Sequence, residues 1–214
     1  MDTEALVRFA ADAVTLEGNL AIPRGARGIV LFAHGSGSSR HSTRNRYVAG
    51  VLNQAGIATF LFDLLTAEEE REDLVTAKLR FDIPLLAERV AAATDWVAND
   101  PRTRGLRIGY FGASTGAAAA LVAAAGRDDI AAIVSRGGRP DLAGDALPKV
   151  AAPTLLIVGG RDTVVIELNE SARKEMRAET ELKIIPGATH LFEEPGALEQ
   201  VARLAADWFA RYLQ

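Results

Sequence analysis

Apolar residues gather in short continuous runs along the chain, and between these runs they recur at helical spacing. A short, unbroken apolar run is typical of a strand that is buried on both faces of a parallel sheet. Runs of this kind, or strand-like alternation, occur at Val14–Ile22, Gly28–Ala33, Ala58–Phe62, Ile108–Phe111, Ile130–Val134, Thr154–Val158 and Leu182–Ile185. With a further strand beginning near Val7, the pattern predicts a sheet of about eight strands.

The intervening stretches predict helices that alternate with these strands. Their apolar residues have helical spacing at Arg46–Ala55, Ile83–Val97, Thr115–Ala125, Ile166–Arg177 and Ala197–Leu213. Alternating strands and helices form βαβ units, so we expect an α/β fold with a mostly parallel sheet and helices on both faces. Turn residues at Gly18-Asn19 and Pro23–Gly25 predict an antiparallel N-terminal hairpin. Without a repeat or long linker, residues 1–214 are expected to form one domain with no large cap domain.

Composition and charge narrow the classes of function. A net charge of −4 argues against nucleic-acid binding, which requires an electropositive face. The chain has no cysteine, which excludes disulfides and thiolate nucleophiles. Met1–Glu4 lacks the features of a signal peptide, and the apolar run Ala117–Ala125 is too short for a membrane helix. We therefore expect a cytoplasmic monomer or small homo-oligomer that acts on a small molecule without membrane contact.

Gly112-Ala113-Ser114-Thr115-Gly116 is a G-x-S-x-G motif at the join of a predicted strand and helix. A serine hydroxyl becomes an effective nucleophile when a sharp turn exposes it to a base, and this motif supplies such a turn. The competing interpretation is a dinucleotide-binding loop. The glycines at 109, 112 and 116 do not have the G-x-G-x-x-G spacing of that loop. The motif therefore favours Ser114 as a nucleophile.

Asp162 and His190 follow Ser114 in the chain order Ser, Asp, His. Asp162 comes directly after a predicted strand, where its carboxylate would lie at the edge of the sheet that carries catalytic groups. Its ordinary alternative role is to cap the next helix. His190 lies in the loop after the last strand, whereas the other two histidines, His34 and His41, precede the nucleophile. We predict that His190 is the general base and that Asp162 orients it.

The segment His34–Ser39 follows an early parallel strand and is rich in small residues. Its backbone amides are candidates for an oxyanion hole, together with the amide of Thr115 after the nucleophile. We assign the first donor to Ser36, with Gly35 and Gly37 as alternatives. His34 is expected to support the loop.

Two groups of arginines follow predicted strands. Arg136 is a candidate substrate-binding residue, since a guanidinium clamps a carboxylate or phosphate, and Arg40, Arg44, Arg46 and Arg139 are weaker candidates. The alternative is that these arginines pair with carboxylates such as Asp63 or Asp141 or remain solvated. The acidic stretch from Ala67 to Asp73 is interpreted as a solvated helix start or loop, with a small lid as the alternative.

In these motifs and their order the chain resembles the α/β-hydrolase superfamily, and its compactness is similar to the dienelactone-hydrolase-like branch. The resemblance implies a serine hydrolase that cleaves an ester, lactone or related acyl bond through an acyl-enzyme, with no cofactor or metal. Dienelactone hydrolases use a cysteine nucleophile, whereas this chain has Ser114, so a broader range of esters is implied. The alternative is a non-catalytic α/β-hydrolase scaffold that binds a small ligand or a protein partner.

Overall fold

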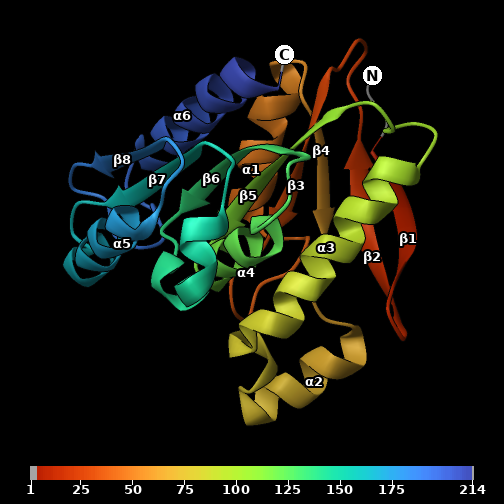
Figure 1. The fold of residues 1–214 in the computed structure, drawn as a ribbon, viewed down its shortest axis with the longest axis horizontal. Coiled ribbons are helices and arrows are strands. Elements are labelled where there is room, and N and C mark those ends of the chain that lie inside the picture. Colours follow the sequence, from red (N-terminus) through yellow and green to blue (C-terminus); the bar gives the residue numbers. More distant parts are fainter. Residues whose placement is uncertain (1–3, 214) are drawn as a thin grey trace.

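The computed structural model describes residues 4–213, and its centre is an eight-stranded sheet with the order β1-β2-β4-β3-β5-β6-β7-β8 (Figure 1). The strands are β1 (Ala5–Ala11), β2 (Val14–Ala21), β3 (Gly28–Ala33), β4 (Ala58–Phe62), β5 (Arg107–Ala113), β6 (Ile130–Arg136), β7 (Thr154–Gly159) and β8 (Thr180–Ile185). The helices are α1 (Thr43–Gln54), α2 (Ala67–Thr76), α3 (Ile83–Asn99), α4 (Thr115–Ala124), α5 (Thr163–Glu175) and α6 (Ala197–Tyr212), with 3-10 segments η1 (Leu79–Phe81) and η2 (Pro140–Lys149).

The strand pairing confirms the predicted α/β architecture. Strands β3 to β8 pair in parallel, and the β1–β2 hairpin joins them antiparallel through β4. Every residue of β3, β4 and β7 is buried, as their unbroken apolar runs predict. The hairpin alternates buried and more exposed positions because it lies at the edge of the sheet.

Two hydrophobic cores lie on opposite faces of the sheet. On one face α3 and α4 cover a core that includes Phe60 and Tyr110. On the other face α1 and α6 cover a core that includes Phe111 and Phe209. Figure 1 shows the two helix layers, with α2 standing at one end of the molecule. In the described part of the chain, no helix combines the length and hydropathy of a bilayer span.

Local hydrogen bonds account for the differences between the predicted and observed elements. Helix α1 begins at Thr43, three residues earlier than its apolar spacing indicates, because the Ser42 hydroxyl caps it by accepting from the Asn45 amide. Helix α2 forms despite its few apolar residues because Thr66 and Glu69 make a reciprocal capping box. The acidic stretch therefore starts a helix, consistent with its main interpretation.

The join between β5 and α4 leaves no room for a side chain at Gly116. A Cβ added at Gly116 would lie 2.3 Å from the carbonyl oxygen of Ala33 and 2.4 Å from that of His34. Because both neighbours are backbone atoms, they have little freedom to move aside. Gly116 therefore lets the first turn of α4 lie directly against the end of β3.

We expect Gly116→Ala to lower the free energy of unfolding by about 1–3 kcal/mol, because the added methyl overpacks a contact with backbone. Gly50→Ala is the matched control, since Gly50 is also helical and an added Cβ there meets no atom within 4 Å. That control is expected to stabilise the protein by about 0.5–1 kcal/mol. Urea unfolding of both variants tests the packing, and equal stability of Gly116→Ala and the parent protein would contradict it.

Candidate active site

Ser114 occupies a strained backbone conformation between β5 and α4. Its φ is 51° and its ψ is −122°, a region that costs a non-glycine residue about 1–3 kcal/mol. Three hydrogen bonds hold it there. The Ser114 amide donates to the carbonyl of Arg136 at 3.3 Å, and the Ser114 carbonyl accepts from the amides of Ala117 and Arg139, each at 3.1 Å. The side chain remains partly exposed at the carboxyl edge of the sheet.

Close packing explains why glycines stand on either side of Ser114. A Cβ at Gly112 would lie 2.4 Å from the Cα of Ala117, and Gly116 packs against β3 as described above. Neither glycine has a positive φ, so their role is to permit the approach of strand and helix. The strained torsion falls on Ser114 itself.

Asp162 and His190 are brought together by the ends of β7 and β8. The His190 Nδ1 lies 2.6 Å from Asp162 Oδ2, and the two side chains are 39% and 17% exposed. Asp162 does stand at the N-cap position of α5, but its side chain makes no capping hydrogen bond. The carboxylate is therefore available to orient the imidazole, as required of the third member of a triad.

His190 reaches the neighbourhood of Ser114 through Gly137. A Cβ at Gly137 would lie 3.4 Å from His190 Cε1, and the preceding residue, Arg136, accepts the Ser114 amide. Within residues 4–213 the hydrogen bonds of His190 include the one to Asp162 but none to the Ser114 hydroxyl. Such catalytic hydrogen bonds often form fully only with substrate bound. Ser114, Asp162 and His190 thus lie at one edge of the sheet, with the Asp–His half of the arrangement already formed.

The candidate oxyanion donors face each other across the elbow. The hydroxyl oxygens of Ser36 and Thr115 are 2.9 Å apart, which joins the loop after β3 to the start of α4. Thr115 is the first residue of α4, so its amide has no acceptor within the helix. Gly35 also approaches closely, since a Cβ there would lie 3.1 Å from the Cβ of Ser114. Ser36 and Gly35 therefore both remain candidates for the first donor, whereas no atom of Ser114 lies within 4 Å of a Cβ added at Gly37.

His34 is buried and fixes this loop. Its Nε2 accepts the amide of Leu64 at 3.0 Å, and its Nδ1 lies 3.0 Å from the Gly35 carbonyl, so Nδ1 carries the proton. Burial lowers the pKa of His34, and the hydrogen bond to Gly35 and the charges of Asp63 and Glu70 oppose that shift only in part. A neutral imidazole thus ties the ends of β3 and β4 together, which matches the supporting role expected from the sequence.

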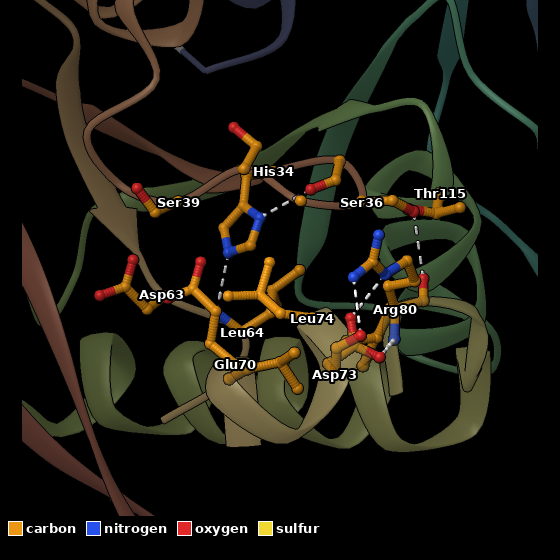
Figure 2. A pocket seen from close by; sticks show the side chains of 15 residues that line it. His34, Ser36, Ser39, Asp63, Leu64, Glu70, Asp73, Leu74, Arg80 and Thr115 are labelled. Carbon is orange, nitrogen blue, oxygen red and sulfur yellow. Dashed lines mark hydrogen bonds and ion pairs between the residues drawn. The ribbon is translucent and has the colours of Figure 1, made fainter. Parts of the chain in front are cut away.

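A cavity opens beside the elbow, between the loop after β3 and the segment formed by α2 and η1. It is lined on one side by His34, Ser36 and Thr115 and on the other by Leu74 and Arg80 (Figure 2). Ser114, Asp162 and His190 are not part of its lining. The cavity therefore lies on the β3–β4 side of the nucleophile, behind the candidate oxyanion donors.

The side of the cavity formed by α2 and η1 includes the acidic stretch from Ala67 to Asp73, for which the sequence offered a small lid only as the alternative, and the ion pair that holds it was not predicted. Asp73 is 3% exposed and accepts from the amides of Leu79 and Arg80 and from the Arg80 guanidinium. Burial opposes ionisation of Asp73, but the hydrogen bonds from Arg80 lower its pKa. This pairing fixes η1 against α2 and leaves Leu74 at the cavity. An acidic residue seven positions before an arginine is the only sequence signal of it.

Carboxylates neutralise most of the arginines that the sequence marked as candidates. Arg40 pairs with Asp63 and Glu17, Arg44 with Glu193, Arg46 with Glu4, and Arg139 with Asp141. Arg136 differs, because none of the ion pairs or side-chain hydrogen bonds among residues 4–213 involves it, and its Nη1 is buried without a partner. In the same range, no cluster of three or more His, Asp or Glu side chains is placed to hold a metal ion.

Comparison with known proteins places this geometry in a family context. Residues 16–214 match the model of the dienelactone hydrolase family. The crystal structure of a dienelactone hydrolase from Anabaena variabilis has 62% sequence identity to this chain and a TM-score of 0.98. The match covers 100% of this chain and 99% of that one. A more distant structure, Est1E from Butyrivibrio proteoclasticus, shares the fold at 18% identity and a TM-score of 0.80, with coverage of 96% and 98%.

Two proteins of Mycobacterium tuberculosis strains are also 62% identical, over 208 residues and 97% of this chain. Both carry the provisional name of a phosphoribosyl transferase. The match covers 46% of each of them, so the chain spans about half the length of these relatives.

The state of His34 leads to a prediction about stability and pH. Because the folded pKa of His34 is lowered, the unfolded chain binds its proton first as the pH falls through about 6.5. The contribution of neutral His34 to the free energy of unfolding is therefore fully present above that pH. It decreases below that pH, by up to about 1.4 kcal/mol per pH unit. We expect His34→Gln to show a shallower decline than the parent protein between pH 6.5 and 5, measured by urea unfolding.

The matched control is His41→Gln, since His41 lies in the exposed part of the loop. It should keep the slope of the parent protein. An identical slope in His34→Gln would show that His34 is not held neutral by the fold.

Proposed function

Because the chain belongs to the dienelactone hydrolase family, we propose that it is a serine hydrolase that cleaves an ester, lactone or related acyl bond through an acyl-enzyme. The observation that carries the proposal is the 2.6 Å contact between Asp162 and His190, at the same sheet edge as a strained, partly exposed Ser114. The Asp162 carboxylate contacts His190 in place of capping α5, and Ser114 stands nearby at the elbow. The three residues thus suit the roles of orienter, base and nucleophile.

In the proposed first step, the Nε2 of His190 accepts the proton of the Ser114 hydroxyl while its oxygen attacks the carbonyl carbon of the substrate. Asp162 accepts a hydrogen bond from the Nδ1–H of His190, which keeps the proton on Nδ1 and leaves Nε2 as the acceptor. The developing negative charge on the carbonyl oxygen is stabilised by the amide of Thr115 and by a second amide from Ser36 or Gly35. The N-terminus of α4 adds a favourable dipole at the same point.

His190 next donates its proton to the leaving oxygen. The alcohol then departs, and the acyl group remains bonded to Ser114. Water then attacks the acyl carbon with His190 again as base, which releases the acid and restores the Ser114 hydroxyl. Every group in this cycle belongs to the chain itself. The scheme therefore requires no organic cofactor.

The nature of the nucleophile bears on the substrate. A serine in the elbow position favours ordinary esters and lactones, and the cavity beside it offers Leu64, Leu74 and Leu86 to an uncharged group. The name of the tuberculosis relatives describes proteins about twice as long as this chain. We therefore do not propose phosphoribosyl transfer as the activity of this chain.

Ser114→Ala is the direct test of the proposal. We expect it to reduce kcat on p-nitrophenyl or lactone substrates by several orders of magnitude, on the order of 10⁶ for a nucleophile of this type. The fold should persist, because the Ser114 hydroxyl makes no hydrogen bond to the core within the described part of the chain. Ser171→Ala, an exposed position in α5, is the control and should retain activity. A Ser114→Ala protein with a tenth of the parent activity would exclude Ser114 as nucleophile.

The pH profile of kcat/KM tests the base. His190 accepts the Ser114 proton only when neutral, so we expect the rate to fall on the acid side between pH 9 and 5.

Asp162→Asn should lower the rate by roughly 10⁴, because an amide stabilises the wrong imidazole tautomer. His190→Ala should cost about as much as Ser114→Ala, and far more than His34→Ala. A folded protein whose rate does not fall at acid pH, and whose activity is the same in the Asp162 and His190 variants, would favour the non-catalytic scaffold.

A further inference from the structure

Arg136 lies at the point where the two halves of the candidate triad meet. It is the last residue of β6 and pairs with Ala113, the residue before the nucleophile, on a neighbouring strand about 4.8 Å away. Its carbonyl accepts the Ser114 amide, and Gly137 after it lies against His190. The backbone of Arg136 is therefore adjacent to both Ser114 and His190.

The guanidinium of Arg136 is buried without a counter-charge. The residue is 9% exposed, and its Nη1 is enclosed without a hydrogen-bond partner. Burial lowers the pKa of Arg136 to about 10, and the positive charge of Arg44 adds to this effect. An ionised group in such surroundings is costly unless an anion accompanies it.

Other arginines in the chain show what is missing. Arg89 is as buried, at 7% exposure, but it bonds to Glu69 and to the Ala11 carbonyl. Arg139, in the same loop as Arg136, makes a two-pronged contact with Asp141 at 2.8 and 2.7 Å. The fold thus supplies partners for the guanidinium groups of Arg89 and Arg139, whereas none of the described residues pairs with that of Arg136.

A second guanidinium lies on the same side. Arg136 shares a sheet face with Val134, two positions earlier, which packs under α1 and α6. Arg44 comes from the first turn of α1, and its Nε is also buried without a partner. Its only carboxylate contact among the described residues is Glu193, at 3.3 Å, and the Glu193 side chain is 65% exposed. The pair therefore carries an excess of positive charge.

The position of this pair relative to Ser114 identifies the part of the substrate it faces. The oxyanion loop and the cavity follow β3 and β4, on one side of β5. Arg136 ends β6, and Asp162 and His190 follow β7 and β8, on the other side. His190 delivers its proton to the leaving oxygen, so the leaving group lies toward the same side as Arg136.

We propose that Arg136, assisted by Arg44, binds an anion on the leaving group, so that the preferred substrates are esters of alcohols or phenols that carry a carboxylate or a phosphate. This inference rests on the proposed function. It makes Arg136 a specificity-determining residue, with the planar guanidinium matched to either anion. The products are an acid and an anionic alcohol, and the acyl group occupies the opposite side of the elbow.

Matched aryl acetates test the proposal. The anionic substrates are 4-acetoxybenzoate and 4-acetoxyphenyl phosphate, the neutral one is methyl 4-acetoxybenzoate, and monophenyl succinate places the anion on the acyl side. The ratio of kcat/KM for anionic over neutral substrates is compared between the parent protein and Arg136→Met. We expect the variant to lower this ratio about tenfold to hundredfold, mainly through KM, because a charged hydrogen-bonded contact is lost.

Arg127→Met is the control, since it removes the same charge from a residue that is paired with Asp95 and Asp129 and takes no part in the elbow, and it should keep the parent ratio. A higher ratio for the phosphate ester than for the carboxylate assigns the site to phosphate, and the reverse assigns it to carboxylate. An unchanged ratio in Arg136→Met would overturn the proposal. A preference for the anion of monophenyl succinate would also overturn it.

Binding of the product separates this inference from the proposed function. We expect 4-hydroxybenzoate, but not its methyl ester, to raise the Tm of the parent protein and of Ser114→Ala, and to have little effect on Arg136→Met. Should no ester be cleaved, the proposed function fails, and the Tm shift still decides for or against the anion site. Arg44→Met, with a reduced shift, replaces Arg136→Met if that variant does not fold. Absence of a shift in the parent protein would contradict the proposal.

Discussion

The strained backbone at Ser114 is the constraint on which the arrangement of the site depends. A φ of 51° turns the chain from the end of β5 directly into α4, and the hydrogen bonds from Ala117 and Arg139 to the Ser114 carbonyl hold the turn closed. That turn exists because α4 approaches β3 and β5 without intervening Cβ atoms at Gly112 and Gly116. The energy of packing α4 into the core thus maintains a serine in a conformation that it would not adopt alone.

A second choice between hydrogen bonds underlies the proposed chemistry. Asp162 stands where an aspartate ordinarily caps a helix, yet its carboxylate contacts His190 and α5 begins without a side-chain cap. Losing an N-cap costs a helix about 1 kcal/mol. The fold tolerates that cost at Asp162 and keeps His190 oriented, which is the pattern expected where local stability is given up for function.

Much of the fold followed from the sequence because unbroken apolar runs identify buried parallel strands with little ambiguity. The glycine and serine spacing at the elbow was equally informative, since its steric reason is local. Helix α2 was harder to predict, because a capping box and the contact of Glu69 with Arg89 stabilise it rather than an apolar stripe. The cavity and the isolation of Arg136 depend on which side chains meet in space. Spacing along the chain could mark Arg136 as a candidate but could not show that no carboxylate among residues 4–213 pairs with it.

The central claim is that Ser114 is a nucleophile activated by His190, and covalent labelling with a fluorophosphonate tests it most directly. The account predicts one adduct per chain, located by peptide mass spectrometry on the peptide that contains Ser114, with labelling strongly slowed in His190→Ala. The folded protein should lose all labelling in Ser114→Ala. Failure of the folded parent protein to react, or an adduct on a different residue, would contradict the account.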